Sequence, residues 1–155
     1  MAALFYLETS ALVKLYVREP GTDRLLQLTR PELNHRFALL AIAPVEFRSA
    51  IRRRQRAGDI EKRVAAEIIN RFTQHMETMF IQQSLSEAVL DTASRLIDRY
   101  PLRAYDAVQL AGCLTLRAMS GKEGPIFVCS DHPLLEAAQS ERLPSLDPTT
   151  PHETE

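Results

Sequence analysis

Four acidic residues stand where a strand or a loop gives way to a helix in this chain, namely Glu8, Glu46, Asp106 and Asp131. Carboxylates are strongly hydrated and are rarely buried without a partner. Several carboxylates brought together therefore indicate a bound cation. Hard carboxylate oxygens suit Mg²⁺ or Mn²⁺, and such ions commonly serve phosphate chemistry. The four residues predict a site for one or two divalent ions.

Each of these acids also has a purely structural interpretation. Asp131 fits a helix N-cap, and Asp106 fits a residue placed to favour a helix dipole. Glu46 could form a surface ion pair with a nearby arginine, and Glu8 could be an exposed turn residue. The elements that position the acids decide whether the four side chains can meet.

The chain alternates between strand-like and helix-like segments. Short, continuously apolar runs are typical of parallel strands buried on both faces, and they predict strands at residues 4–7, 37–42, 79–83 and 126–129, with an edge segment at 143–146. Helices are predicted from Thr9 or Ser10, from Thr22 or Asp23, over 45–56, after Asp59, from Ser86 to before Pro101, over 103–119 and after Asp131. In the helix after Asp59, an apolar stripe is expected from residues at every fourth position: Val64, Ile68, Phe72 and Met76.

Strands separated by helices indicate an α/β fold, a three-layer α/β/α sandwich with a mainly parallel central sheet. One domain is expected over residues 1–147, followed by a polar, flexible tail at 148–155. Glu8 and Asp131 follow strands, and open α/β sheets form their ligand crevice at the carboxyl ends of strands. Glu46 and Asp106 lie in first helical turns, whose free N–H groups favour carboxylates and phosphates. The four acids can therefore converge.

Composition limits the function classes. The chain has 155 residues, 45% of them hydrophobic and 25% charged, which is ordinary for one soluble domain. A net charge of −1 argues against nucleic-acid binding over the whole surface, so any such binding must be local. We expect no membrane segment and a cytoplasmic location, with Cys113 and Cys129 as buried thiols.

Arginines crowd the helix that carries Glu46, at positions 48, 52, 53, 54 and 56. They form either a solvated face or a stripe that tracks phosphates. Arg53 is seven positions after Glu46 and shares its face, so it is the arginine expected nearest the acidic site.

A resemblance to the PIN domain family is carried by four segments of the chain. This family comprises metal-dependent ribonucleases and includes the VapC toxins of bacterial type II toxin–antitoxin pairs. The first segment, YLETSALVKLYVREPGT, resembles the family's opening strand and helix. The others are similar to its second acidic helix, third acidic motif and final strand with acid: APVEFRSAIRRR, LRAYDAVQLAGCL and FVCSDHPLLEAA. Their order and separation match over nearly the whole chain.

The resemblance implies an Mg²⁺- or Mn²⁺-dependent endoribonuclease that hydrolyses RNA phosphodiester bonds and acts as the toxin of such a pair. It implies that the metal-binding and catalytic carboxylates are Glu8, Glu46, Asp106 and Asp131. It also implies that Ser10 orders the first acid or a metal-bound water, while Thr9, Arg103 and Ser130 match the motifs more loosely. RNA, a cognate antitoxin protein and a second copy of the chain are the implied partners. The antitoxin is expected on the helix pair between Val45 and Met79.

Glu8 departs from the family, which typically has aspartate at this position. The extra methylene moves the carboxylate by roughly one C–C bond length, whereas Mg²⁺ requires oxygens at about 2.0–2.1 Å in a near-octahedral arrangement. The metal could shift, the glutamate could fold back, or binding could weaken. The alternative function is therefore a non-catalytic PIN-like module that binds RNA or protein. A phosphoaspartate phosphatase or receiver fits less well, because Glu8-Thr9-Ser10 lacks a nucleophilic aspartate followed by a second acid.

Overall fold

Five short strands form a wholly parallel sheet at the centre of the computed structural model, which describes residues 2–151. The strands are β1 (Leu4–Leu7), β2 (Arg36–Leu40), β3 (Ile81–Gln83), β4 (Ile126–Val128) and β5 (Ser145–Leu146), in the spatial order β3-β2-β1-β4-β5. In the central strand, Phe5 is in register with Phe37 of β2 and with Ile126 of β4. The predicted α/β class and parallel sheet are confirmed.

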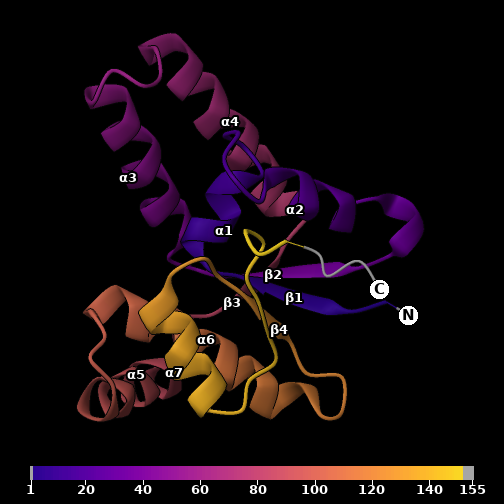
Figure 1. The fold of residues 1–155 in the computed structure, drawn as a ribbon, viewed down its shortest axis with the longest axis vertical. Helices are drawn as coiled ribbons and strands as arrows, with labels where there is room; N and C mark the ends of the chain where they lie inside the picture. Colours follow the sequence, from indigo (N-terminus) through magenta and orange to yellow (C-terminus); the bar gives the residue numbers. More distant parts are fainter. Residues whose placement is uncertain (1, 152–155) are drawn as a thin grey trace.

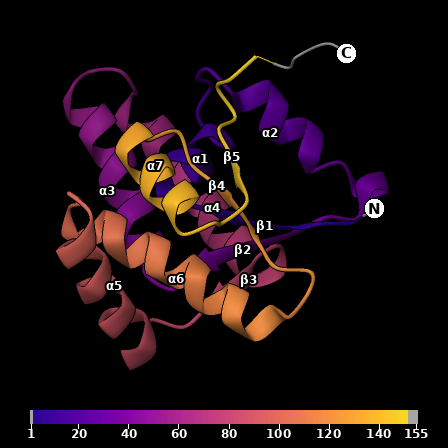
Figure 2. The same cartoon turned by 60° about the horizontal axis from the view of Figure 1, so that its bottom comes forward.

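Helices cover both faces of the sheet (Figures 1 and 2). One layer contains α1 (Thr9–Lys14), α2 (Thr22–Leu28), α3 (Ala43–Arg56) and α4 (Lys62–Thr78). The other contains α5 (Glu87–Arg99), α6 (Ala104–Ser120) and α7 (His132–Ser140), and the short 3₁₀ helix η1 (Pro31–Leu33) precedes β2. Alternate side chains of β1 feed two separate cores, with Leu4 and Tyr6 packing under α5–α7 and Phe5 and Leu7 under the other layer. These cores make the three-layer sandwich.

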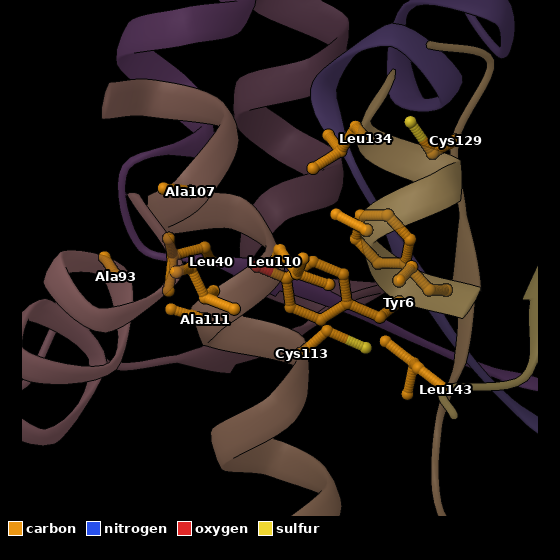
Figure 3. Close-up of a cluster of buried hydrophobic side chains, with 14 of the residues drawn as sticks. Tyr6, Leu40, Ala93, Ala107, Leu110, Ala111, Cys113, Cys129, Leu134 and Leu143 are labelled. Atoms are coloured by element: carbon orange, nitrogen blue, oxygen red, sulfur yellow. The ribbon is translucent and has the colours of Figure 1, made fainter. Parts of the chain in front are cut away.

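Helix α6 lies very close to β1 in the core shown in Figure 3. A Cβ atom at Gly112 would lie 2.5 Å from the Tyr6 hydroxyl oxygen and 3.0 Å from Leu40 Cδ1. Tyr6 is fully buried and stacks on Phe127 with ring centroids 5.9 Å apart. The absence of a side chain at Gly112 therefore sets how near α6 can approach the sheet.

The stripe predicted for α4 is partly wrong. The residues buried on this helix are Ala65, Ile69, Phe72 and Met76, while Val64 is 37% exposed. Residues four positions apart are rotated about 40° from one another around the helix axis, so a series spaced strictly by four leaves one face of the helix within a few steps. A series with mixed spacings of three and four stays on that face. The helix also begins at Lys62 with Glu61 as its N-cap, and Asp59 lies in the preceding loop.

Smaller differences concern element ends. Helix α1 begins at Thr9, but Thr9 or Ser10 was expected to cap it, whereas the N-cap is Glu8, whose side chain accepts a hydrogen bond from the Ser10 backbone N–H. Strand β2 ends at Leu40, since Ala43 already begins α3 with Pro44 in its first turn. Within residues 2–151, no helix combines the length and apolar character needed to cross a membrane.

The carboxyl-terminal segment after β5 contacts α2. Arg24 Nη1 donates to the carbonyl oxygens of Asp147 and Thr150, each at 3.2 Å. Of the tail expected at 148–155, residues 152–155 lie outside the described residues.

Candidate functional site

One cleft of about 740 Å³ brings together the four acids at the carboxyl edge of the sheet. Glu8 follows β1 and Asp131 follows β4, while Glu46 and Asp106 lie in the first turns of α3 and α6. We call this cleft the acidic cleft, and the predicted residues that line it are Glu8, Thr9, Ser10, Glu46, Arg53, Arg103, Asp106 and Asp131. Sequence segments far apart in the chain thus meet as the topology requires.

Glu8 folds back onto the helix that it caps. Its carboxylate accepts a 3.0 Å hydrogen bond from the Ser10 backbone N–H and a short one from the Ser10 hydroxyl. Only 6% of the residue is exposed, and this burial raises the pKa of Glu8 to about 7, against the opposing effect of the Ser10 hydrogen bonds. The Glu8 carboxylate is thus directed toward the start of α1, where Ser10 holds it.

Glu46 is held by a polar network that reaches into the core. Its carboxylate accepts hydrogen bonds from Thr9 Oγ1 and Gln109 Nε2, both at 2.9 Å. Gln109 is 1% exposed, and its Oε1 accepts a hydrogen bond from the Tyr6 hydroxyl at 3.0 Å. Burial raises the pKa of Glu46, while the hydrogen bonds from Gln109 and Thr9 oppose the rise.

Asp106 and Asp131 occupy the opposite side of the acidic cleft, at the starts of α6 and α7. Asp131 caps α7, because its Oδ2 accepts a hydrogen bond from the Leu134 N–H at 3.2 Å. Burial raises the pKa of Asp106, the negative charge of Asp131 raises it further, and Arg103 lowers it. The interpretation of Asp131 as an N-cap is therefore correct, and it coexists with a place in the cleft.

The remaining predicted residues divide into two groups. Ser130, Ser10 and Glu8 are joined by consecutive hydrogen bonds. The Ser130 backbone N–H donates to Ser10 Oγ at 3.3 Å, and the Ser10 hydroxyl donates to the Glu8 carboxylate. Ser130 itself does not line the cleft, and its buried hydroxyl has no hydrogen-bond partner within the described residues. Arg53 and Arg103 are exposed on the cleft walls.

The donor chemistry of the acidic cleft fits a hard divalent ion. It offers carboxylate oxygens, and the pKa values of Glu8, Glu46 and Asp106 are raised, so an added cation would relieve an unfavourable burial of charge. Within residues 2–151, however, no three His, Cys, Asp or Glu side chains are grouped as a ready-made metal site. To bind a metal ion, the carboxylates of Glu8 and Glu46 would have to give up hydrogen bonds that they accept from protein groups.

Two residues of this site were missed by sequence reasoning, namely Gln109 and Tyr6. Gln109 lies three positions after Asp106 on α6, so the two residues share a helix face. That spacing was the available signal, because a polar residue in an otherwise apolar helical stretch needs a partner when buried. Tyr6 was expected only as part of an apolar strand, yet its hydroxyl orients Gln109 toward Glu46.

Comparison with known proteins identifies the fold. No family model matches the sequence, and no curated protein matches it at a significant level. Among solved structures, VapBC2 from Rickettsia felis bound to a DNA fragment from their promoter matches with a TM-score of 0.61 and 11% identity, covering 92% of this chain and 97% of that chain. VapBC-1 from nontypeable Haemophilus influenzae matches with a TM-score of 0.61 and 14% identity, covering 95% and 99%. FitAcB from Neisseria gonorrhoeae gives 0.57 and 14%, covering 93% and 97%.

The protein therefore has the same fold as chains of these VapBC and FitAcB structures, over almost the whole length of both partners in each comparison. Identities of this size establish the fold alone. The PIN-like sandwich expected from the four sequence segments agrees with this result.

Proposed function

We propose that the protein is a VapC-like toxin, an endoribonuclease that depends on Mg²⁺ or Mn²⁺. The observation that carries the proposal is the meeting of four acids, from four separate segments, in one cleft of a fold shared with VapBC and FitAcB structures. A helix-capping role explains Asp131 and Glu8 singly, but it does not explain why all four carboxylates line the same cleft.

In this proposal the residues that hold the metal are Glu8, Glu46, Asp106 and Asp131. The ion, when bound, supplies positive charge to a phosphodiester and acidifies a water molecule. Gln109 and Thr9 fix the Glu46 carboxylate from two sides, and Ser10 fixes Glu8. Metal ligation would exchange part of these hydrogen bonds for contacts with the ion, while the carboxylates already line one cleft.

Other cleft residues support a nucleic-acid substrate. Arg53 and Arg103 provide cations on the cleft walls, where phosphates would meet them. Tyr105 is 64% exposed and Val45 is 68% exposed, and both line the same cleft. An exposed aromatic ring can stack on an unpaired base, which suits RNA recognition.

The direct test is cleavage of a structured RNA by the purified chain in Mg²⁺ or Mn²⁺. Asp106→Asn should lower the rate by at least about a hundredfold, because it removes one metal-binding charge from the cleft. Asp91→Asn is the matched control, since Asp91 is an exposed acid of α5 outside the cleft, and its rate should equal that of the wild type. Equal inactivity of all three proteins in both metals would refute the enzymatic proposal.

A second candidate function is a non-catalytic PIN-like module that binds RNA or protein. It is favoured by one observation, the engagement of the Glu8 carboxylate by Ser10, which leaves that carboxylate turned toward its own helix. In this case Glu8→Asp should restore affinity for divalent ions, because aspartate shortens the side chain by one methylene.

We also propose an antitoxin protein and a second copy of the chain as partners. The similarity to VapBC and FitAcB chains supports an antitoxin. The surface offers an apolar groove of about 410 Å³ that includes Tyr16, Leu26, His75 and Met79 among its lining residues. Leu26 is 41% exposed and Met79 is 56% exposed, and α4 belongs to the helix pair on which the antitoxin was expected.

A further inference from the structure

A second cleft, of about 460 Å³, adjoins the acidic cleft and differs from it in charge. Three cations line it, Lys14, Arg53 and Arg54, against two carboxylates, Glu19 and Asp59. We call it the cationic cleft. The two clefts share the lining residues Ser10, Ala50 and Arg53, so one passes into the other along the contact between α1 and α3.

Lys14 is a buried ammonium with spare hydrogen-bonding capacity. Its side chain is 9% exposed, and its Nζ donates to Glu19 Oε1 at 3.1 Å, which is its single hydrogen bond within the described residues. An ammonium carries three N–H donors, so two of them have no acceptor among residues 2–151. A buried charge with unused donors is unfavourable unless an anion or water completes its surroundings.

Glu19 cannot neutralise this cleft. The same carboxylate pairs with Lys14 through Oε1 and with Arg54 through Oε2, so two cations share one negative charge. Arg53, one residue before Arg54, forms no ion pair within residues 2–151 and stands at the junction of the two clefts. The excess positive charge is thus on the side of the cleft that leads to the acids.

We propose that the cationic cleft binds a phosphate of the RNA backbone, adjacent to the phosphodiester that lies among the four acids. Lys14 and Arg54 contact the phosphate oxygens there, and Arg53 lies between the two backbone positions. The inference rests on the proposed nuclease function. A polyanionic strand is the occupant that fits, because a chain of phosphates can present one group to the metal-binding acids and the next to the cations.

The test measures RNA binding separately from cleavage. A short, fluorescein-labelled single-stranded RNA of mixed sequence is titrated in Mg²⁺ against the full chain carrying Asp106→Asn, and anisotropy is recorded over a range of KCl concentrations. Arg54→Gln in this background should weaken binding about tenfold. It should also reduce the slope of log K against log salt by about 0.7, the value for one lost phosphate contact on a single strand.

Glu19→Gln is the more discriminating variant because it should strengthen binding. It frees Lys14 and Arg54 from a carboxylate while keeping an oxygen that can accept from Lys14. A purely structural ion-pair network predicts unchanged or weaker binding instead. Matched controls are Arg56→Gln on α3 and Asp23→Asn in the exposed Arg18–Asp23 pair, which change the same charges outside both clefts and should leave affinity within about twofold.

The outcomes separate this inference from the proposed activity. Charge-dependent binding without cleavage by the unmodified chain would retain the phosphate site and overturn the nuclease. Cleavage with binding unaffected by Arg54→Gln and Glu19→Gln would overturn the phosphate site and retain the nuclease. The phosphate site would also be overturned if both variants lost binding to a protein partner while their RNA affinity was unchanged, because the cleft would then serve that partner. Thermal melts of each variant confirm that the chain is folded, and Lys14→Gln provides a second test if Arg54→Gln does not fold.

Discussion

Glu8 combines three structural properties. It caps α1, it is 6% exposed, and it lines a cleft with three other acids. Because its charged form is poorly solvated, the protonation of this one group is coupled to the stability of the metal-free fold. The same burial would make a divalent ion a favourable replacement for the proton.

The pH dependence of stability follows from this coupling. The pKa of Glu8 is raised from its ordinary value of 4.5 to about 7, so between these values the folded chain holds a proton that the unfolded chain has released. The stabilisation is complete below pH 4.5 and is lost as the pH rises through 7. In EDTA, urea unfolding should show a free energy of unfolding that falls by up to about 3 kcal/mol across this window.

Glu8→Gln should flatten this dependence, since glutamine keeps a similar shape without the titrating group. Glu46 and Asp106 have raised pKa values as well, so a shallower decline with pH should remain. Glu67→Gln, an exposed position on α4, serves as the control and should preserve the full slope. A wild-type free energy of unfolding that is constant or rises between about pH 5 and pH 7 would contradict the assignment.

Helix α6 is the element that joins the core to the candidate site. Asp106, Gln109 and Gly112 follow one another at intervals of three residues along it. Asp106 lines the acidic cleft, Gln109 donates to Glu46, and Gly112 lies against the Tyr6 hydroxyl. The position of α6 on the sheet therefore also sets the position of two of the four acids.

Gly112→Ala should destabilise the protein although alanine is the better helix former. Alanine gains about 1 kcal/mol over glycine inside a helix. Here its Cβ would lie 2.5 Å from the oxygen of a fully buried tyrosine that is hydrogen-bonded to Gln109. Overpacking of this kind costs about 1–3 kcal/mol, so we expect a net loss of about 1 kcal/mol in urea unfolding.

If the chain has the proposed nuclease activity, the same substitution should lower it, because displacement of α6 moves both Asp106 and the donor to Glu46. Gly124→Ala is the matched control, since the nearest atom to its added Cβ is Arg117 Cγ at 3.4 Å, an ordinary contact with a flexible side chain. It should change stability by less than about 0.5 kcal/mol. A Gly112→Ala protein more stable than the wild type would show that α6 can move away without penalty.

The elements differ in how well their sequences predicted them. Leu4–Leu7 reads as a doubly buried strand, and the structure confirms it, because all four positions face a core. The apolar stripe of α4 was misplaced because Val64 and Ala65 are both apolar, and a strict four-residue spacing selects Val64 where the helical period selects Ala65. The convergence of the four acids followed from topology, whereas the network through Tyr6 and Gln109 depends on the close approach allowed at Gly112, which no local pattern specifies.

Across the whole molecule, the acidic cleft is built by both helical layers. Glu8 and Glu46 begin helices on one face of the sheet, while Asp106 and Asp131 begin helices on the other (Figure 1). Any ion that binds all four acids must therefore connect the two layers. Binding energy of such an ion is available only in the folded chain, because unfolding separates ligands that are up to 123 positions apart in the sequence.

Divalent ions should consequently raise the melting temperature of the protein. A ligand that binds only the folded state adds about 2.7 kcal/mol of stability at a concentration of a hundred times its Kd. If the chain is a working nuclease, Mg²⁺ or Mn²⁺ raises the melting temperature of the wild type, EDTA reverses the shift, and Asp106→Asn diminishes it. If Glu8 has weakened the metal site, the melting temperature of the wild type does not shift and that of Glu8→Asp rises. Aspartate can still cap α1, and its carboxylate lies one methylene closer to the backbone. Absence of a shift in both proteins would mean that the four carboxylates do not bind divalent ions, and the nuclease proposal would fail with it.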